Sequence, residues 1–440
     1  MSMRSVLPFI DTPAIETALA HHPAVKSVRA DFTNSRVVAH VVPDLDCPEI
    51  ETQQLAHWRE IYDESFAATN DMLHGWISSY TGDPLPREDM EEWVAATTER
   101  ILSLMPHCVI EIGSGTGLLA DRIAPLTGRY IAIDAAQACQ DRLSDLIRTR
   151  PDLSLIEQIT ADAGSLPADL SADMVILNSI VQYFPNAAYL TRVIERTLGW
   201  IGNGAIFVGD IRDLDLLPDF YESLARYRGL TAKAEIDRFV STRMVQEEEF
   251  AISPAYFHAL TERFSRIHRV RVLRRTGRRP NELTTYRYDA IIHVGPPRAQ
   301  DGTDWNDRHP VTNDPSLPLA RAHLPGVLRR FLEQHSLMPE CPLTFEIMGI
   351  EGEVEPPADN AANDSSEDRL VGLWRACLQS PSIGPDDDFF AAGGSSLLVM
   401  QLRKRIGDEF GVTVPLSVFA RSATPRAIGR VIQDAIPKSG

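Results

Sequence analysis

One segment limits the fold of this chain more than any other. In residues 108–123 a short apolar strand, a glycine-rich turn and an amphipathic helix follow one another. Gly113, Gly115 and Gly117 allow the backbone of the turn to approach a ligand closely, and the N-terminus of the helix favours a carboxylate or phosphate group. The segment therefore predicts an α/β domain with a ligand at the carboxyl end of its strand.

Three kinds of ligand compete for this turn. A Walker loop requires Gly-Lys-Ser/Thr, and a dinucleotide fingerprint has Gly-x-Gly-x-x-Gly, whereas this chain has Gly-x-Gly-x-Gly. Glu111, which closes the strand, is unfavourable beside a pyrophosphate but suits a cationic ligand. Asp134 ends a second strand, where a ribose diol is bound in this architecture, and Asp162 follows a weaker strand. These acids and glycines together resemble the cofactor site of class I S-adenosylmethionine-dependent methyltransferases; structural glycines without a ligand are the alternative.

Four further blocks carry a more specific resemblance. Residues 75–82, 174–185, 206–212 and 281–289 are similar to blocks of the methyltransferase domains embedded in adenylation domains of non-ribosomal peptide synthetases. The resemblance implies methyl transfer to a carrier-bound aminoacyl or peptidyl thioester, with the methyl group emerging near the end of the fourth strand. Strand-end polar residues often only cap loops. The catalytic residues that the resemblance implies are Asn178, Tyr183, Asp210, Glu282 and Tyr286.

The resemblance favours methylation of the α-nitrogen but leaves other reactions open. An α-amino group has a pKa near ~8, lower still beside a thioester, so a modest base can deprotonate it. Ile77 stands where the family has asparagine, and residues 132–136 read Ala-Ile-Asp-Ala-Ala instead of Gly-Thr-Asp-Phe-Ser. C-methylation, epimerisation on the same fold and an inactive docking module therefore remain alternatives. His74 is a candidate base, with an ordinary surface histidine as the other interpretation.

A separate signature lies near the C-terminus. Residues 386–398 resemble the attachment site of acyl and peptidyl carrier proteins, in which a serine at a helix start receives phosphopantetheine. An acidic residue, two aromatic residues and a Gly-Gly pair precede that serine, and this order selects Ser396 over Ser395; an ordinary serine helix cap is the alternative. The resemblance implies a phosphopantetheinyl transferase as a partner. The core face of the following helix is predicted to comprise Val399, Leu402, Ile406 and Phe410.

The remaining flanks resemble an adenylation C-terminal subdomain that the methyltransferase domain interrupts. Residues 1–48 are its expected first part and residues 310–357 its second, with the methyltransferase domain at 50–295 and the carrier domain at 366–436. Residues 300–360 contain no lysine, although the closing motif of that subdomain normally carries one, and the ATP-binding core is absent from the chain. We therefore expect a scaffold that does not activate amino acids. The expected fold class is α/β: a Rossmann-like class I methyltransferase, a small α/β remnant and a helical carrier bundle.

Composition narrows the range of partners. A formal net charge of −18 argues against nucleic acid. The five cysteines form no Cys-x-x-Cys pair and no histidine cluster has ligand spacing, so we expect no metal. No segment approaches about 18 uninterrupted apolar residues, and the start of the chain has no signal-type apolar run. We expect a cytoplasmic protein without membrane contact, whose partners are its carrier-bound substrate and other synthetase domains or subunits.

Overall fold

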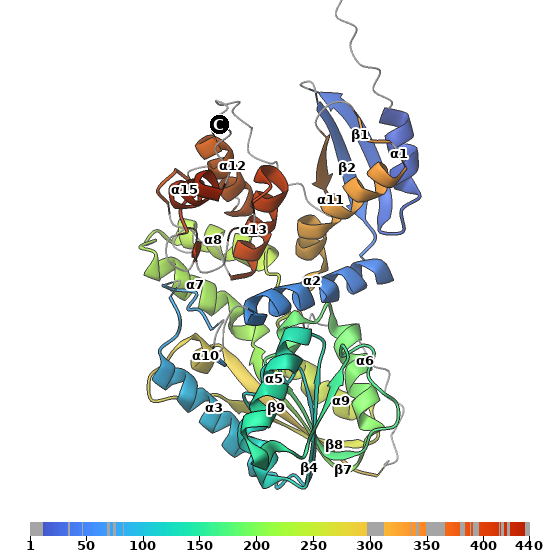
Figure 1. The fold of residues 1–440 in the computed structure, drawn as a ribbon, viewed down its shortest axis with the longest axis vertical. Coiled ribbons are helices and arrows are strands. Elements are labelled where there is room, and N and C mark those ends of the chain that lie inside the picture. Colours follow the sequence, from blue (N-terminus) through green and yellow to red (C-terminus); the bar gives the residue numbers. More distant parts are fainter. Residues whose placement is uncertain are drawn as a thin grey trace, which may run out of the picture.

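The computed structural model describes three parts of the chain: residues 12–296, 312–348 and 366–435. They form a large unit around a seven-stranded sheet, a small unit around a three-stranded sheet, and a helical bundle (Figure 1). Outside the description, within these ranges, lie residues 34–35, 46, 68–70, 74–75, 82, 336, 340–342, 379–382, 388, 390–395, 413, 415–417 and 420–422.

The large sheet has the strand order β5-β4-β3-β6-β7-β9-β8. Strands β5, β4, β3, β6 and β7 run parallel to one another, and β9 runs antiparallel to both β7 and β8. The central strands are almost continuously apolar because both faces of the sheet are buried. The expected Rossmann-like sheet is thereby confirmed. Its strands are β3 (Cys108–Ile112), β4 (Arg129–Asp134), β5 (Ile156–Thr160), β6 (Ala172–Asn178), β7 (Ile201–Arg212), β8 (Ile267–Arg274) and β9 (Arg287–Val294).

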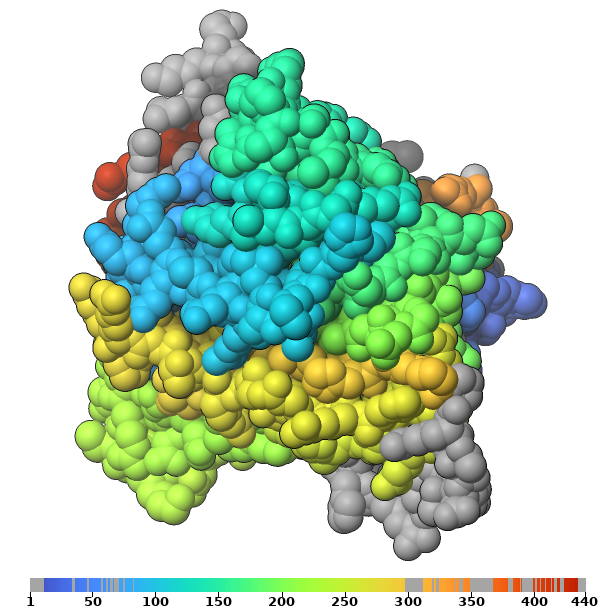
Figure 2. All heavy atoms as spheres, turned by 90° about the horizontal axis from the view of Figure 1, so that it is seen from below, coloured from blue at the N-terminus to red at the C-terminus, as the bar shows by residue number. Residues whose placement is uncertain are grey.

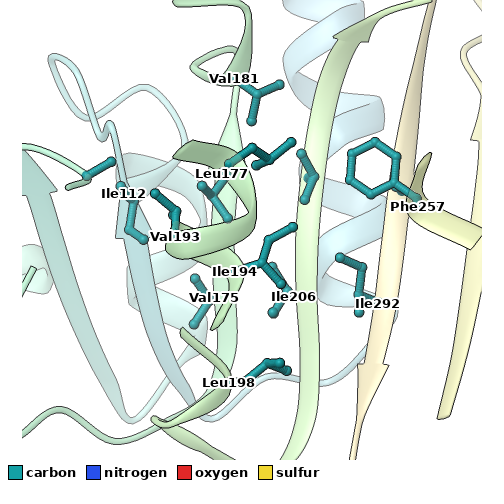
Figure 3. Packing of buried hydrophobic residues seen from close by; sticks show 14 of the residues in the cluster. Ile112, Val175, Leu177, Val181, Val193, Ile194, Leu198, Ile206, Phe257 and Ile292 are labelled. Carbon is teal, nitrogen blue, oxygen red and sulfur yellow. The ribbon is translucent and has the colours of Figure 1, made fainter. Parts of the chain in front are cut away.

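Helices cover both faces of this sheet. On one face, α6 (Ala187–Leu198) and α9 (Pro254–Arg263) pack on the strands, and Figure 3 shows Val193, Ile194 and Phe257 of these helices together with Val175 and Ile206 of the sheet. The opposite face is covered by α3 (Arg87–Leu102), α4 (Ala120–Ile123) and α5 (Gln137–Thr149). The connections contain α7 (Leu217–Tyr227), α8 (Lys233–Val245), α10 (Glu282–Thr285), η1 (Ala124–Leu126), η2 (Pro151–Leu153), η3 (Val181–Tyr183) and η4 (Leu214–Leu216).

Helix α3 lies beside the segment that links β8 to α10. Figure 2 shows the two as adjacent blue and yellow surfaces. Arg100 of α3 donates a hydrogen bond to the carbonyl oxygen of Arg274 at 2.7 Å. From the linking segment, the backbone N–H of Arg278 donates to the carboxylate of Glu92 at 3.0 Å. These contacts hold α3 against the antiparallel edge of the sheet.

The small unit is built from residues that precede the large unit in the sequence and residues that follow it. Strand β10 (Leu343–Ile347) pairs in parallel with β2 (Arg36–Pro43), which pairs antiparallel with β1 (Val25–Thr33). Helices α1 (Thr12–Ala20) and α11 (Ser316–Gln334) supply the rest of its core, to which Leu324, Leu328 and Leu332 contribute at four-residue intervals. From the sequence we expect α11 to begin only near residue 325. The structure begins it at Ser316, and its buried face starts with Ala320. Helix α2 (Pro48–Ala67) leads from this unit to the large one.

The helical bundle comprises α12 (Ser366–Leu378), α13 (Ser396–Phe410) and α15 (Pro425–Ala435). Trp374 is fully buried in its centre and donates from Nε1 to the carbonyl oxygen of Ala423 at 3.1 Å. The predicted core face of α13 is confirmed: Val399, Leu402 and Ile406 are buried, and Phe410 packs partly buried against them.

Candidate active site

The glycine-rich turn lies where β3 has β4 on one side and β6 on the other. All three glycines are left-handed, with φ of +74° at Gly113, +54° at Gly115 and +91° at Gly117. A Cβ on Gly113 would come within 2.4 Å of Ile180, and one on Gly117 within 2.6 Å of Leu143. At Gly115, by contrast, a Cβ would meet no atom within 4 Å. The turn therefore borders open space at Gly115, where a ligand can reach the backbone.

Two of the three predicted acids lie at neighbouring strand ends. Asp134, which ends β4, accepts hydrogen bonds from the backbone N–H groups of Gly115 at 2.8 Å and Ala136 at 2.9 Å. Burial raises the pKa of its carboxyl group, and these N–H donors oppose that shift. Asp162 lies two residues beyond β5, half-buried, and accepts from the N–H of Gly164 at 2.8 Å. Asp134 is thus joined directly to the glycine turn, whereas Asp162 organises its own loop.

The third acid, Glu111, is enclosed in the sheet. Its side chain is almost fully buried and accepts a hydrogen bond of 2.6 Å from the hydroxyl of Tyr130. Burial raises its pKa to about 8, although the Tyr130 hydrogen bond acts in the opposite direction. Within the described residues it has no cationic partner. A positively charged ligand nearby would therefore favour ionisation of Glu111.

Three buried side-chain oxygens around the turn have no hydrogen-bond partner within the described part of the chain. They are Ser114 Oγ in the turn, Asn178 Oδ1 at the end of β6, and Gln182 Oε1 in η3. A buried polar atom without a partner is destabilising. The three oxygens therefore suit a polar ligand that brings N–H or O–H donors into this space.

An unusual backbone pair lies at the ends of β6 and β7. Ser179 and Asp210 both have left-handed conformations, with φ of +55° and +59°, which is strained for residues other than glycine. The N–H of Ser179 donates to the carbonyl oxygen of Gly209 at 3.0 Å, and its Oγ donates to Asp210 Oδ2 at 2.8 Å. No sequence pattern indicated this pair. Such strain is typical of sites where the position of a side chain matters.

Asp210, which belongs to this pair, is one of the predicted catalytic residues. It is completely buried. Its carboxylate accepts hydrogen bonds from Trp93 Nε1 at 3.2 Å and Arg287 Nη1 at 2.8 Å, in addition to Ser179. Its backbone N–H donates to Asp289 Oδ1 at 2.9 Å. The structure therefore places Asp210 behind the site, in contact with protein groups.

A pocket next to this network brings two other predicted residues together. Glu282 accepts hydrogen bonds from the backbone N–H of Ser79 at 3.0 Å and from its hydroxyl at 3.3 Å, and burial raises the pKa of Glu282. The ring of Tyr286 packs edge-on against that of Phe220, with centroids 5.2 Å apart. The pocket is lined by Ser79, Arg212, Asp213, Leu217, Phe220, Glu282, Tyr286 and Arg287.

Tyr183, the last predicted catalytic residue, lies under helix α2 instead of in this pocket. Its ring packs against Trp58 with centroids 4.4 Å apart and against Tyr62 with centroids 5.4 Å apart. Asp63 of the same helix accepts a hydrogen bond from the N–H of Ala138 at 2.9 Å. Sequence reasoning missed α2; its aromatic residues at four-residue spacing, of which Trp58 and Tyr62 are two, were the available signal.

The segment around Ile77 folds into a short turn. Ile77 forms an isolated bridge with Pro84, and the N–H of Ser78 donates to the carbonyl oxygen of Asp83 at 2.9 Å. This turn brings Ser79 within hydrogen-bond distance of Glu282. His74 lies outside the described residues.

Ser396 is the first residue of α13. The Gly-Gly pair and Ser395 before it lie outside the described residues. The serine selected by the sequence signature is thus at a helix start, where a phosphate group is favoured.

Two protein families match this chain. Residues 110–204 match the family described as "Methyltransferase domain", and residues 368–432 match "Phosphopantetheine attachment site". The chain pairs a methyltransferase domain with a phosphopantetheine carrier domain. Their cofactors are S-adenosylmethionine and phosphopantetheine.

The methyltransferase and carrier domains have relatives among the non-ribosomal peptide synthetases. Chondramide synthase cmdD of Chondromyces crocatus is 37% identical over 338 residues, which is 70% of this chain and 9% of that protein. The probable non-canonical synthetase CymA of Salinispora arenicola is 27% identical, over 98% of this chain and 7% of its own length. The beauvericin synthetase of Beauveria bassiana is 28% identical, over 82% and 12%. The chain spans about a tenth of these relatives.

Solved methyltransferases show a weaker likeness. Magnesium protoporphyrin IX methyltransferase of Synechocystis is 12% identical, with a TM-score of 0.36 over 55% of this chain and 97% of that one. The N-methyltransferase NodS of Bradyrhizobium japonicum is 13% identical, with a TM-score of 0.33 over 53% and 98%. The assignment of a Rossmann-like fold to the methyltransferase domain rests on its strand order.

The residues of the methyltransferase domain fit S-adenosylmethionine. This molecule has an ammonium group and ribose hydroxyls, which need acceptors, and a positive sulfonium. Asp134 and the unpartnered oxygens of Ser114 and Gln182 are such acceptors, and the space at Gly115 leaves room beside the backbone. None of the described helices is both long and apolar enough to cross a membrane. Nor do the described residues group three or more His, Cys, Asp or Glu side chains as metal ligands would be.

Replacing Asp134 with alanine is expected to weaken S-adenosylmethionine binding by about 1–3 kcal/mol, because ribose hydroxyls would lose a buried acceptor. Isothermal titration calorimetry on the full chain measures this change. Asp141→Ala is a matched control, since Asp141 is an exposed aspartate on the neighbouring helix α5. Equal affinity in the Asp134 and Asp141 variants would place the ribose elsewhere.

Proposed function

We propose that this chain transfers a methyl group from S-adenosylmethionine to the α-nitrogen of an aminoacyl or peptidyl thioester, held on phosphopantetheine at Ser396, in non-ribosomal peptide synthesis. The observation that carries this proposal is the carboxyl group of Glu282. It lines a pocket of a methyltransferase domain, and no cationic side chain pairs with it in the described part of the chain. A buried carboxylate in that position suits the amino group of a substrate.

Glu282 has the properties of a general base for this reaction. Burial raises its pKa, while the hydrogen bonds from Ser79 and the charges of Arg287 and Arg212 oppose this shift, and a carboxylate of raised pKa is a better acceptor for the proton of the substrate nitrogen. The hydrogen bonds from Ser79 hold the carboxylate while leaving it further lone pairs. S-adenosylmethionine supplies an electrophilic methyl group when bound. The neutral nitrogen would form the new N–C bond as the bond from the methyl carbon to the sulfonium sulfur breaks, the sulfur would leave as a neutral thioether, and Glu282 would keep the proton.

The aromatic cluster formed by Trp58 and Tyr62 of α2 with Tyr183 serves to exclude water from the site. Burial raises the pKa of both Tyr62 and Tyr183, so their hydroxyls stay neutral at physiological pH. Together with Trp58 they form an enclosed wall next to Gln182 and the end of β6. Excluding water strengthens the electrostatic interactions of a site and prevents side reactions.

The small unit is interpreted as a remnant of an adenylation C-terminal subdomain. Its sheet is completed only when β10, which follows the methyltransferase domain, pairs with β2, which precedes it. This arrangement supports an insertion within an older subdomain. Its proposed role is that of a scaffold, and the proposed partners are other synthetase domains or subunits and a phosphopantetheinyl transferase.

A loaded substrate tests the reaction. A synthetic aminoacyl-pantetheine arm on Ser396, with S-adenosylmethionine, is expected to gain one methyl group on nitrogen, located by fragmentation mass spectrometry. Asn178→Ala is expected to slow this transfer roughly tenfold to a hundredfold, the effect of losing one buried hydrogen bond of about 1–3 kcal/mol, while cofactor affinity changes less.

Asn203→Ala is the control for this variant, because Asn203 is exposed on the neighbouring strand β7. A methyl group on the α-carbon would replace the proposal with C-methylation. Exchange of the α-proton with deuterated solvent, without methylation, would identify an epimerase. If a loaded wild-type chain shows neither methylation nor exchange of the α-proton, the remaining function is that of an inactive docking module.

A further inference from the structure

The pocket is lined by two partly buried arginines, each with 14% of its side chain exposed, that differ in how their nitrogens are used. Arg212 uses both terminal nitrogens, from Nη1 to Glu249 at 2.6 Å and from Nη2 to Glu247 at 2.7 Å. Arg287 uses only Nη1, to Asp210 at 2.8 Å. A guanidinium carries five N–H groups, and among the described residues nothing accepts from Nε or Nη2 of Arg287. Arg212 therefore keeps three unused N–H groups and Arg287 four, and only Arg287 has a terminal nitrogen with no acceptor among the described residues.

The network behind Arg287 fixes the direction of these donors. Asp210, which holds Arg287, is itself held by Trp93, Ser179 and the backbone bond to Asp289. Asp289 is completely buried and forms ion pairs with Arg100 and Arg275, so it cannot move freely. Arg275 in turn lies over the ring of Trp93, 4.9 Å from its centroid. Each contact to Asp210 thus comes from an element that is anchored separately.

Charge decides which kind of acceptor Arg287 can take. Its positive charge is already balanced by Asp210, and that of Arg212 by Glu247 and Glu249. A free carboxylate would therefore meet no excess positive charge, and it would lie in the same pocket as the carboxylate of Glu282. A neutral carbonyl oxygen accepts an N–H bond without that repulsion.

We propose that Arg287 binds the carbonyl oxygen of the tethered thioester and that Asp210 is the residue that positions it. The inference rests on the proposed function for the identity of the substrate. An α-aminoacyl thioester carries an amine and a carbonyl on adjacent carbon atoms, and it needs one acceptor and one donor close together. Glu282 and Arg287 line the same pocket and supply this pair, whereas a free amino acid presents a carboxylate instead.

A double-mutant cycle between Arg287 and the carbonyl tests this assignment. The probes are two unreactive aminoacyl-pantetheine analogues: one keeps the carbonyl as an amide, and the other has a CH₂ group in its place. Calorimetry on the full chain should show that the wild type prefers the carbonyl analogue by roughly tenfold to a hundredfold. In Arg287→Gln the preference should fall below about threefold, with S-adenosylmethionine affinity unchanged.

Arg271→Gln is the matched control, because Arg271 is exposed on β8, the strand that pairs with β9, and does not line the pocket. It should keep the carbonyl preference. Asp210→Asn should reduce the preference without weakening S-adenosylmethionine binding, as a positioning residue would. An unchanged preference in Arg287→Gln, or its loss in Arg271→Gln as well, would overturn the inference.

The binding readout separates this inference from the proposed function. If the loaded wild type gains no methyl group but the cycle shows coupling, Arg287 still binds the carbonyl and the proposed reaction is wrong. If methylation proceeds and the cycle shows no coupling, the reaction stands and the role of Arg287 is wrong.

Discussion

Ser396→Ala is expected to lose phosphopantetheine loading completely, because the arm is attached through the hydroxyl of this side chain. Ser396 begins α13, and the unpaired N–H groups of a helix start favour the phosphate of the arm. Incubation of the full chain with coenzyme A and a phosphopantetheinyl transferase, followed by intact-mass measurement, should show a single added arm on the wild type and none on the variant.

Ser395→Ala is the control, since it changes the adjacent serine and leaves Ser396 intact. It should load like the wild type. Loading that persists in Ser396→Ala and disappears in Ser395→Ala would shift the attachment site by one residue. Loss of loading in both variants, with α13 still protected in hydrogen exchange, would show that the transferase reads the serine pair as a unit.

Asp289→Ala is expected to lower the free energy of unfolding of the methyltransferase domain by about 3–5 kcal/mol, the cost of removing one partner from a buried ion pair. Asp289 is fully buried between Arg100 and Arg275 and accepts the N–H of Asp210. Its loss would leave two arginines without their carboxylate. Urea unfolding followed by hydrogen exchange of the β7 amides reports on this domain specifically.

The control is Glu157→Ala, which removes an ion pair with Arg129 on the same sheet, 2.8 Å apart but with both side chains about half exposed. An exposed pair contributes roughly 0–1 kcal/mol. Equal destabilisation by the two substitutions would mean that the buried network contributes no more than a surface pair does.

The units of this chain could be predicted because their signals are local. The apolar runs that become β3, β4 and β6 predict buried parallel strands, and the glycines after β3 predict a turn that adopts left-handed angles. The α13 core face follows from apolar spacing within a single helix. Asp134 could be placed beside Gly115 because parallel strands end at the same edge of a sheet.

Other parts of the site depend on contacts between residues that are distant in sequence. Ser79 and Glu282 are 203 positions apart, and Arg100 and Asp289 are 189 apart. The left-handed backbone of Ser179 and Asp210 results from the packing of two adjacent strand ends and has no signature in residue type. For the same reason, the family resemblance implied that Asp210 is catalytic, and its burial behind Arg287 was not foreseen.

The sequence by itself determined the Rossmann-like sheet, the glycine turn with Asp134, and the carrier helix that begins at Ser396, because the signals for them are short local patterns of apolar residues, glycines and strand-end acids. Only the tertiary structure decided that one terminal nitrogen of Arg287 has no acceptor among the described residues, while both terminal nitrogens of Arg212 donate to carboxylates. Both arginines are strand-end residues of the same charge. What separates them is the number of carboxylates within reach, and that number depends on how β7, β9 and the segment before α9 pack together.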